Sequence, residues 1–309
     1  MELYQISRGF ARKTIDMRGD DGRLWIERLP ALIARCAHRW TLTVHPPYDN
    51  LSYNYVMPVE RADGAPAVLK IGFPADNELQ TELAALEQVA GRGMARLLEA
   101  DPEQSVMLLE RVEPGTPLTT LADDDTATRI AATVMARIWQ PVAEPGRFPA
   151  IADWGQGFGR MRLRFAGGSG PIPPQLADRA ELLFAELLAT QAEPVLLHGD
   201  LHHDNILSRR DGAWLAIDPK GVTGEPAYET GAFLRNPGWL AGTPDAANLT
   251  RRRIAIFAEL LGLGRERLLG WAVAQAVLSA WWCIEDNADC LDQAIVLADL
   301  FAGITPREL

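Results

Sequence analysis

The stretch His198-Gly-Asp-Leu-His-His-Asp-Asn205 decides the fold that we expect for this chain. The branched run Val195-Leu-Leu197 precedes it and predicts a short strand. Apolar residues within 206–217, on either side of an Asp211-Gly212 turn signal, predict a hairpin that follows it. Asp218 comes directly after this hairpin, whose two strands return the chain. We therefore expect Asp218 to lie close to the segment His198–Asn205, which we call the polar loop.

The residue types in this loop suit phosphoryl transfer. Their order, H-x-D-L-x-x-x-N followed by an aspartate, matches the catalytic loop of kinases position by position. The reaction needs one carboxylate that orients the attacking hydroxyl and accepts its proton, and oxygen ligands that hold Mg²⁺. Asp200 is the predicted catalytic base, and Asn205 and Asp218 are the predicted metal ligands.

Two other interpretations of these residues are open at this point. Aspartates are common at strand ends, so Asp200 and Asp218 would then be ordinary turn residues. Clustered histidines beside a carboxylate are also what a zinc or di-iron centre uses. His202 and His203 are adjacent, however, and neighbours on a regular element point in different directions. The chain has five histidines and no second cluster of such ligands.

Residues 1–111 are expected to form a small, strand-rich lobe that binds the nucleotide. Asp63-Gly64 predicts a hairpin turn in it. One helix is predicted near 31–39 with Pro30 in its first turn, and another at 77–90. Stretches rich in branched and aromatic residues predict strands at 40–44, 53–59, 67–71 and 106–109.

Lys70 ends the apolar strand Ala67-Val-Leu-Lys70 and is one of three lysines in the chain. It corresponds to the strand lysine of kinases, which holds the α- and β-phosphates of ATP. Such a lysine needs an acidic partner from the helix that follows. Glu82 is the predicted partner because it lies beside the apolar stripe of that helix, and Glu78, one turn earlier, remains open.

Signals for the rest of the nucleotide site are weaker. No G-x-G-x-x-G precedes Lys70. Ser52 and neighbouring backbone N–H groups are therefore the expected cover of the phosphates. The segment from Glu110 to Val112 leads out of the small lobe, and its backbone groups are predicted to contact adenine. A linker without that contact is the equal alternative.

Residues 112–309 are expected to form a larger helical lobe that holds the catalytic loop and the substrate site. The uncharged run from Leu268 to Ile284 is shorter than the roughly 20 residues that span a bilayer, so it predicts a buried helix. The whole pattern predicts an α+β, protein-kinase-like fold of two lobes. Apolar residues at helical spacing predict helices near 130–138, 176–188, 245–261, 265–284 and 290–302.

Composition narrows the range of partners. The net charge of −11 disfavours broad contact with nucleic-acid phosphates or anionic lipids, and it suits a cationic small molecule. Cys36, Cys283 and Cys290 form no C-x-x-C pair, so neither a disulfide framework nor a structural zinc site is indicated. The polar N-terminus lacks the apolar core of a secretory signal. We expect a cytoplasmic location, and the oligomeric state stays open.

Seven segments together resemble the aminoglycoside/hydroxyurea antibiotic-resistance kinases, whose best-known members are streptomycin 6-phosphotransferases. The resemblance spans roughly residues 24–300 and is most specific from Asp200 to Lys220. The segments are Ala67-Val-Leu-Lys-Ile71, Gly91-Arg-Gly-Met-Ala-Arg-Leu-Leu98, Leu108-Leu-Glu-Arg111 with Pro114-Gly115, Leu197-His-Gly-Asp-Leu-His-His-Asp-Asn-Ile-Leu207, Ile217-Asp-Pro-Lys-Gly221, Gly224-Glu-Pro-Ala-Tyr-Glu229 and Leu234-Arg-Asn-Pro237.

The resemblance implies ATP, Mg²⁺ and transfer of the γ-phosphoryl group to a hydroxyl of an aminoglycoside-like antibiotic or related metabolite. Asp218-Pro-Lys220 stands where protein kinases have D-F-G, and no A-P-E follows, so a protein substrate is not expected. Glu229 and Arg235 are expected to be architectural, with Glu229 paired to an arginine. A nucleotide-binding module without turnover, a metal-dependent hydrolase and a kinase of a neutral metabolite are the alternatives.

Acidic residues crowd the last third of the chain, and Trp281-Trp282 adjoins two of them, Glu285 and Asp286. Carboxylates beside aromatic faces would suit a guanidinium-bearing acceptor. Solvated helix faces around a tryptophan-rich core are the simpler interpretation of each single residue. The other acidic residues of this set are Glu225, Glu229, Asp245, Glu259, Asp289 and Asp292.

Overall fold

The structure is a computed structural model that describes residues 6–74, 77–144 and 146–309. The chain divides into two compact units. Unit 1 extends to Gly91 and resumes from Ala95 to Val112, whereas unit 2 consists of Arg92–Met94 and Glu113–Leu309. The use of residues 1–111 for the nucleotide and of residues 112–309 for catalysis and the acceptor stays a prediction.

A five-stranded antiparallel sheet is the centre of unit 1, in the order β1-β2-β3-β5-β4. The predicted hairpin between its second and third strands is confirmed. Gly64 has a φ of 79° in that turn, and Oδ1 of Asp63 accepts the N–H of Ala65 at 3.1 Å. The strands are β1 (Thr43–Val44), β2 (Tyr55–Glu60), β3 (Pro66–Ile71), β4 (Leu97–Asp101) and β5 (Val106–Glu110).

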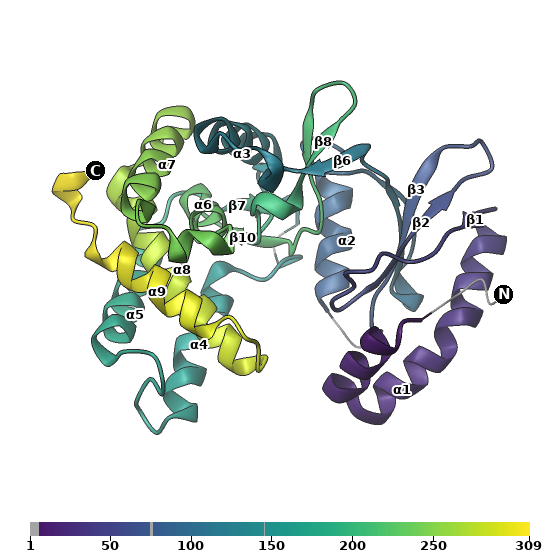
Figure 1. Ribbon diagram of the computed structural model, residues 1–309, viewed down its shortest axis with the longest axis horizontal. Coiled ribbons are helices and arrows are strands. Elements are labelled where there is room, and N and C mark those ends of the chain that lie inside the picture. The colour runs from purple at the N-terminus through teal and green to yellow at the C-terminus, as the bar shows by residue number, and fades with distance from the viewer. Residues whose placement is uncertain (1–5, 75–76, 145) are drawn as a thin grey trace. The chain divides into compact units, whose positions relative to one another are not determined.

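Helices α1 (Arg8–Arg39) and α2 (Glu78–Val89) lie on opposite sides of this sheet (Figure 1). Successive residues of a strand point to opposite faces. Leu69 accordingly packs in the core that the sheet shares with α1, whereas the next residue, Lys70, contacts α2. The alternation of side chains along β3 thus places the cationic side chain of Lys70 on the sheet face that α2 covers.

The helix predicted near 31–39 is only the end of α1, and Pro30 lies inside it rather than in its first turn. Gly19 has φ 61° and ψ −135°, so two helical segments meet there at a kink. Between Arg8 and Leu29 the buried large apolar side chains are Phe10, Trp25 and Leu29. A stripe this sparse among charged residues has no clear helical periodicity, so the sequence predicts only the last part of this helix.

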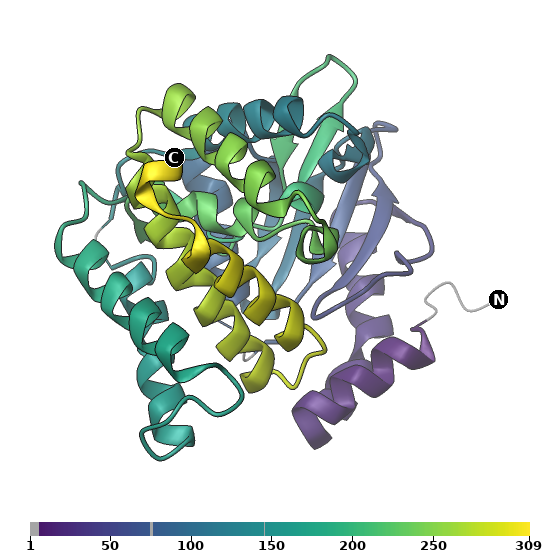
Figure 2. The same cartoon turned by 60° about the vertical axis from the view of Figure 1, so that its left-hand side comes forward.

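Helices make up most of unit 2, and α8 runs through its centre. By length and composition α8 would be able to cross a membrane, but 78% of its apolar window is buried inside the protein. Helix α9 runs beside it (Figure 2). The helices are α3 (Asp124–Ile138), α4 (Ile151–Arg164), α5 (Pro174–Ala189), α6 (Pro226–Leu234), α7 (Ala246–Leu261), α8 (Arg265–Glu285) and α9 (Leu291–Gly303).

Helix α4 was not predicted, because its glycines weaken the helical pattern. The structure shows why they are there. A Cβ at Gly155 would lie 2.3 Å from the ring of Phe184 in α5, and one at Gly157 would lie 2.6 Å from Leu278 in α8. Glycine therefore lets α4 approach its two neighbours closely, at a cost in helix propensity that packing offsets.

Short strands frame the polar loop of unit 2. β7 (Val195–Leu197) pairs antiparallel with β10 (Val222–Gly224). β8 (Ile206–Arg209) pairs antiparallel with β9 (Trp214–Ala216), which confirms the hairpin predicted at Asp211-Gly212. β6 (Pro114–Pro117) completes a three-stranded sheet in the order β6-β8-β9.

Cys283 and Cys290 form a disulfide, although the cysteine pattern of the sequence indicates no disulfide framework. Cys283 lies near the end of α8 and Cys290 directly precedes α9. The turn between the helices brings their Cα atoms to 5.7 Å, a usual separation for bridged cysteines. A spacing of seven residues matches no common disulfide motif, and the proximity arises only from the turn.

Candidate active site

The polar loop begins where β7 ends, and Glu229 of α6 fixes its first residues. Oε2 of Glu229 accepts the backbone N–H of His198 at 2.6 Å, and Oε1 accepts that of Gly199 at 2.9 Å. The prediction that Glu229 pairs with an arginine is wrong, because its carboxylate satisfies these buried amides instead. Burial raises the pKa of Glu229 to about 7, while the two N–H donors act in the opposite direction.

His198 joins the loop to the residue before Asp218. Its Nδ1 accepts the N–H of Asp200 at 3.2 Å, so Nε2 carries the hydrogen and donates to the carbonyl of Ile217 at 2.8 Å. Burial lowers the pKa of His198 to about 4, which keeps the imidazole neutral at pH 7. The carbonyl of His198 also accepts the N–H of Lys220 at 2.8 Å.

The hairpin brings Asp200, Asn205 and Asp218 together in unit 2. Asn205 Nδ2 donates to the carbonyl of Asp200 at 2.9 Å, and the N–H of Ile217 donates to the carbonyl of Asn205 at 2.9 Å. The amide nitrogen of Asn205 is thus used by the loop, and its oxygen is the atom suited to a cation. Asp218 has a φ of 60°, a left-handed conformation that aspartate and asparagine tolerate better than most residues.

The two adjacent histidines lie in different surroundings. His202 Nε2 is 3.8 Å from Oδ2 of Asp200. His203 is buried and stacks on Phe233 with ring centroids 3.8 Å apart. Burial lowers the pKa of His203 to about 2. In the part of the chain that the structure describes, no group of three or more histidine, cysteine, aspartate or glutamate residues is arranged to hold a metal ion.

Arg235 contacts the predicted base, a relationship that the sequence did not reveal. Its Nη2 donates to Oδ1 of Asp200 at 3.2 Å, and its Nη1 donates to Oε1 of Gln275 at 3.0 Å. Nε2 of Gln275 in turn donates to the carbonyl of Tyr228. Arg235 follows α6 directly, and only the packing of α6 on α8 shows which carboxylate it reaches.

In unit 1, Lys70 pairs with Glu82. The Lys70 Nζ lies 2.6 Å from both carboxylate oxygens of Glu82, and both side chains are buried. Glu78, the open alternative, lies in the first turn of α2 and is exposed. The predicted partner of the strand lysine is therefore confirmed as Glu82, while the function of the pair toward phosphates stays a prediction.

The other residues predicted for the nucleotide lie in or near the sheet of unit 1. Ser52 is exposed in the segment between β1 and β2. The N–H of Glu110 donates to the carbonyl of Arg96 at 2.8 Å, and its carboxylate accepts from Arg96 Nε at 3.2 Å. Val112 is buried. Contact of residues 110–112 with adenine therefore relies on backbone groups other than the N–H of Glu110, and it stays a prediction.

Several carboxylates of the last third of the chain have partners inside unit 2. Glu285 accepts from Arg160 through two bonds of 2.7 and 2.9 Å. Glu225 is buried and accepts from Arg267 Nε at 2.6 and 2.7 Å. Arginines of the chain thus already supply guanidinium partners to these two carboxylates, which favours the simpler structural interpretation. A contact between carboxylates of this region and the acceptor stays a prediction.

Comparison of the sequence with known proteins gives consistent matches. The family model of the aminoglycoside/hydroxyurea antibiotic resistance kinases matches residues 39–287. Streptomycin 6-kinase of Streptomyces griseus is 35% identical over 286 residues, which cover 90% of this chain and 91% of that protein. Hydroxyurea phosphotransferase of Kitasatospora aureofaciens is 34% identical over 295 residues, which cover 92% of this chain and 82% of that protein.

Solved structures show the same fold at low identity. A choline kinase from Streptococcus pneumoniae matches with a TM-score of 0.63 at 13% identity, covering 89% of this chain and 98% of its own. An aminoglycoside phosphotransferase in ternary complex with ADP and hygromycin B matches with a TM-score of 0.62 at 15% identity, covering 88% and 98%. The predicted protein-kinase-like fold, with a strand-rich and a helical part, is confirmed.

Proposed function

Because the chain belongs to the aminoglycoside/hydroxyurea antibiotic resistance kinase family, we propose that Asp200, Asn205 and Asp218 form its phosphoryl-transfer centre. The protein is an ATP-dependent kinase that phosphorylates a hydroxyl group of an antibiotic or related small molecule. The observation that carries the assignment of the centre is the closure of the β8–β9 hairpin. It joins Asn205 to Ile217 by a hydrogen bond of 2.9 Å beside the loop that holds Asp200.

Asp200 is the proposed base. The acceptor hydroxyl gives its proton to this carboxylate while its oxygen forms a bond to the γ-phosphorus and the bond from that phosphorus to ADP breaks. The loop geometry supports this function, since Arg235 holds Oδ1 and leaves Oδ2 as the oxygen that takes the proton.

Asn205 and Asp218 are the proposed ligands of Mg²⁺. One amide oxygen and one carboxylate fit this ion, which is usually bound by one or two protein groups together with waters and substrate phosphates. Mg²⁺ held by these two residues would neutralise negative charge that develops on the phosphates during transfer. The hydrogen bond from Asn205 Nδ2 to the loop orients the amide for this purpose.

Lys70, held by Glu82, is the proposed contact of unit 1 with the α- and β-phosphates. Ser52 and its backbone neighbours are the proposed phosphate cover, and backbone groups between Glu110 and Val112 the proposed adenine contact. ATP is the phosphate donor, and a cytoplasmic location would supply it. With these groups in place we do not favour a nucleotide-binding module without turnover.

The acceptor is tested with a panel. The relatives named above act, by their names, on streptomycin and on hydroxyurea. Formation of ADP should therefore be measured with streptomycin, other aminoglycosides, hydroxyurea and neutral polyols. Phosphorylation of at least one antibiotic is the expected result. Turnover with polyols alone would show that the acceptor is a neutral metabolite rather than an antibiotic. Binding of ATP without turnover of any acceptor would contradict the kinase assignment.

A further inference from the structure

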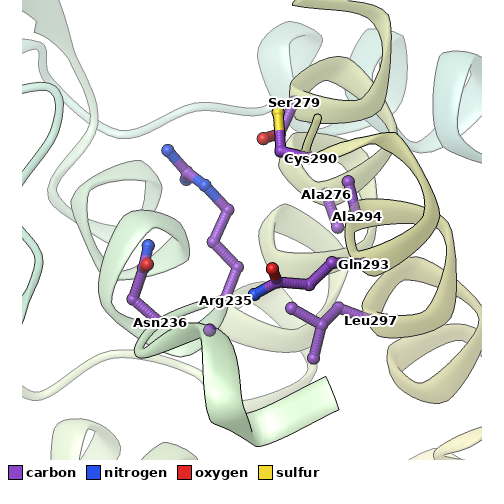
Figure 3. A pocket seen from close by; sticks show the side chains of 9 residues that line it. Arg235, Asn236, Ala276, Ser279, Cys290, Gln293, Ala294 and Leu297 are labelled. Atoms are coloured by element: carbon purple, nitrogen blue, oxygen red, sulfur yellow. The ribbon is translucent and has the colours of Figure 1, made fainter. Parts of the chain in front are cut away.

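A pocket of about 260 Å³ in unit 2 is lined by a residue that also contacts the proposed catalytic base (Figure 3). That residue is Arg235, whose Nη2 donates to Oδ1 of Asp200 at 3.2 Å. Helices α8 and α9 supply the other wall, with Ser279 and Gln293 among their lining side chains (Figure 3). The pocket is therefore one side chain away from the carboxylate that the acceptor hydroxyl has to reach.

The polar groups that line the pocket are uncharged apart from Arg235. Asn236 and Gln293 offer carboxamides, Ser279 offers a hydroxyl, and Leu297 is apolar. None of the lining residues that the structure describes is acidic. An ammonium or guanidinium group would meet the guanidinium of Arg235 here, and it would find no carboxylate of its own in the lining, because Asp200 is already bonded to Arg235. The lining instead suits an uncharged group that donates and accepts hydrogen bonds.

Arg235 is fixed from the side of the protein core. Its Nη1 donates to Gln275 at 3.0 Å, and Gln275 is itself bonded to the carbonyl of Tyr228. Gly231 gives Gln275 its space, since a Cβ at that position would lie 2.5 Å from the carboxamide. A guanidinium has five N–H groups. Arg235 can therefore keep its bonds to Gln275 and Asp200 and still donate to a molecule in the pocket.

We propose that this pocket receives the reacting end of the acceptor as an uncharged, hydroxyl- or amide-bearing group, which Arg235 holds beside Asp200. The inference rests on the proposed function, because it takes Asp200 as the base. Arg235 is here a positioning residue that donates to an oxygen of the acceptor and fixes one oxygen of the base. Cationic parts of a larger acceptor lie outside the pocket.

The first test fills the pocket. Ser279 is half-buried and lines it from α8, so Ser279→Leu takes up pocket volume without entering the core. With hydroxyurea as the uncharged probe and streptomycin as the guanidinium-bearing one, KM for the acceptor should rise at least about tenfold, while KM for ATP stays unchanged. Val296→Leu, at an exposed position of α9 outside the lining, is the control and should change neither constant.

The second test removes the charge of Arg235. Arg235→Gln should lower kcat/KM by about 100-fold for each acceptor that the wild type uses, and Arg235→Ala should regain activity when guanidinium ion is added at non-denaturing concentration. Arg160→Lys, which alters an arginine paired with Glu285 outside the pocket lining, is the control and should retain activity. A purely structural arginine would show no such rescue.

The results that overturn the inference differ from those that overturn the proposed function. A wild-type KM for the acceptor in Ser279→Leu would show that the pocket is not used. A lower KM for streptomycin in Arg235→Gln would show that Arg235 repels a cation that enters the pocket. That result would contradict the proposal that the pocket takes an uncharged group. In both cases the wild type still transfers phosphate. If the wild type forms no ADP with any acceptor, the proposed function fails, and the inference fails with it.

Discussion

The Nζ of Lys70 lies 2.6 Å from each carboxylate oxygen of Glu82, and the two side chains are only 6% and 5% exposed. Each charge is therefore removed from water and depends on the other. The pair joins β3 to α2 inside unit 1. It fixes the position of the lysine amine without any nucleotide, which is what a phosphate-binding group requires.

Breaking this pair should cost more stability than replacing it. Glu82→Leu removes the carboxylate that lies against the buried ammonium of Lys70 and should lower the free energy of unfolding by about 3–5 kcal/mol. The double variant Lys70→Met, Glu82→Leu should recover most of that loss and still lack kinase activity. Urea denaturation and an ADP assay measure the two effects. Arg12→Met, in an exposed pair with Asp16, is the control and should change stability by less than about 1 kcal/mol.

Asp200→Asn should abolish phosphoryl transfer and leave the affinity for Mg-ATP nearly intact. Asparagine keeps an oxygen for the bond from Arg235 but does not act as a base. Calorimetry and the ADP assay test the two statements. Asp204→Asn, an exposed change in the same loop, should retain activity as the matched control. Turnover of Asp200→Asn near the wild-type rate would show that another group accepts the proton.

Loss of the anionic metal ligand should weaken Mg-ATP binding more than loss of the neutral one. Asp218→Asn is the informative variant because asparagine also tolerates the left-handed backbone at this position, where φ is 60°. Asn205→Ala should have the smaller effect. Nucleotide titrations with and without Mg²⁺ measure both, and the three proteins should bind ATP alike when Mg²⁺ is absent. Identical affinities in its presence would contradict the metal assignment.

His203 should make the protein less stable in acid. Its pKa is lowered from 6.5 to about 2 by burial, so the unfolded chain binds a proton below about pH 6.5 that the folded protein does not. The contribution of the neutral His203 to the free energy of unfolding is thus fully present above pH 6.5, and it is lost as the pH falls toward 2. Relative to His203→Phe, the wild type should lose about 1.4 kcal/mol of unfolding free energy for each pH unit below about 6.

Chemical denaturation between pH 7 and 4 measures this difference. His38→Phe, at an exposed histidine of α1, is measured alongside as the control for replacing an imidazole by a phenyl ring. A flat difference for His203→Phe would mean that the buried imidazole takes up a proton in the folded state.

The parts of the fold that the sequence predicted are those specified by local signals. The Asp63-Gly64 and Asp211-Gly212 turns identify two hairpins, and the second of these determines where Asp218 lies. The spacing of apolar residues locates α2 and α7 to α9 within a few positions. Lys70 and Glu82 were paired correctly because the strand and the helix that carry them are consecutive in the chain.

The contacts that the sequence did not predict are mainly between residues that are distant in the chain. Glu229 accepts from His198 and Gly199, thirty residues away, and no local pattern distinguishes that arrangement from an ion pair with an arginine. Arg235 reaches Asp200 only because α6 and α8 pack together. The Cys283–Cys290 disulfide spans only seven residues, but it depends on the turn between α8 and α9, which the cysteine spacing alone does not reveal. Such partners are set by tertiary packing, for which one sequence carries no local signal.

Gly231 has a consequence for how the specificity of this protein can evolve. Any side chain at position 231 competes for space with the carboxamide of Gln275, so a larger residue there requires a change at position 275 as well. On α9, Gln293 limits position 238 in the same way, since a Cβ at Gly238 would lie 2.6 Å from its carboxamide nitrogen. Diversification in nature or in a mutant library should therefore accumulate at Ala294 and Leu297, the other lining residues of α9. Substitutions at position 231, behind Arg235, should by contrast be found only together with a change at Gln275.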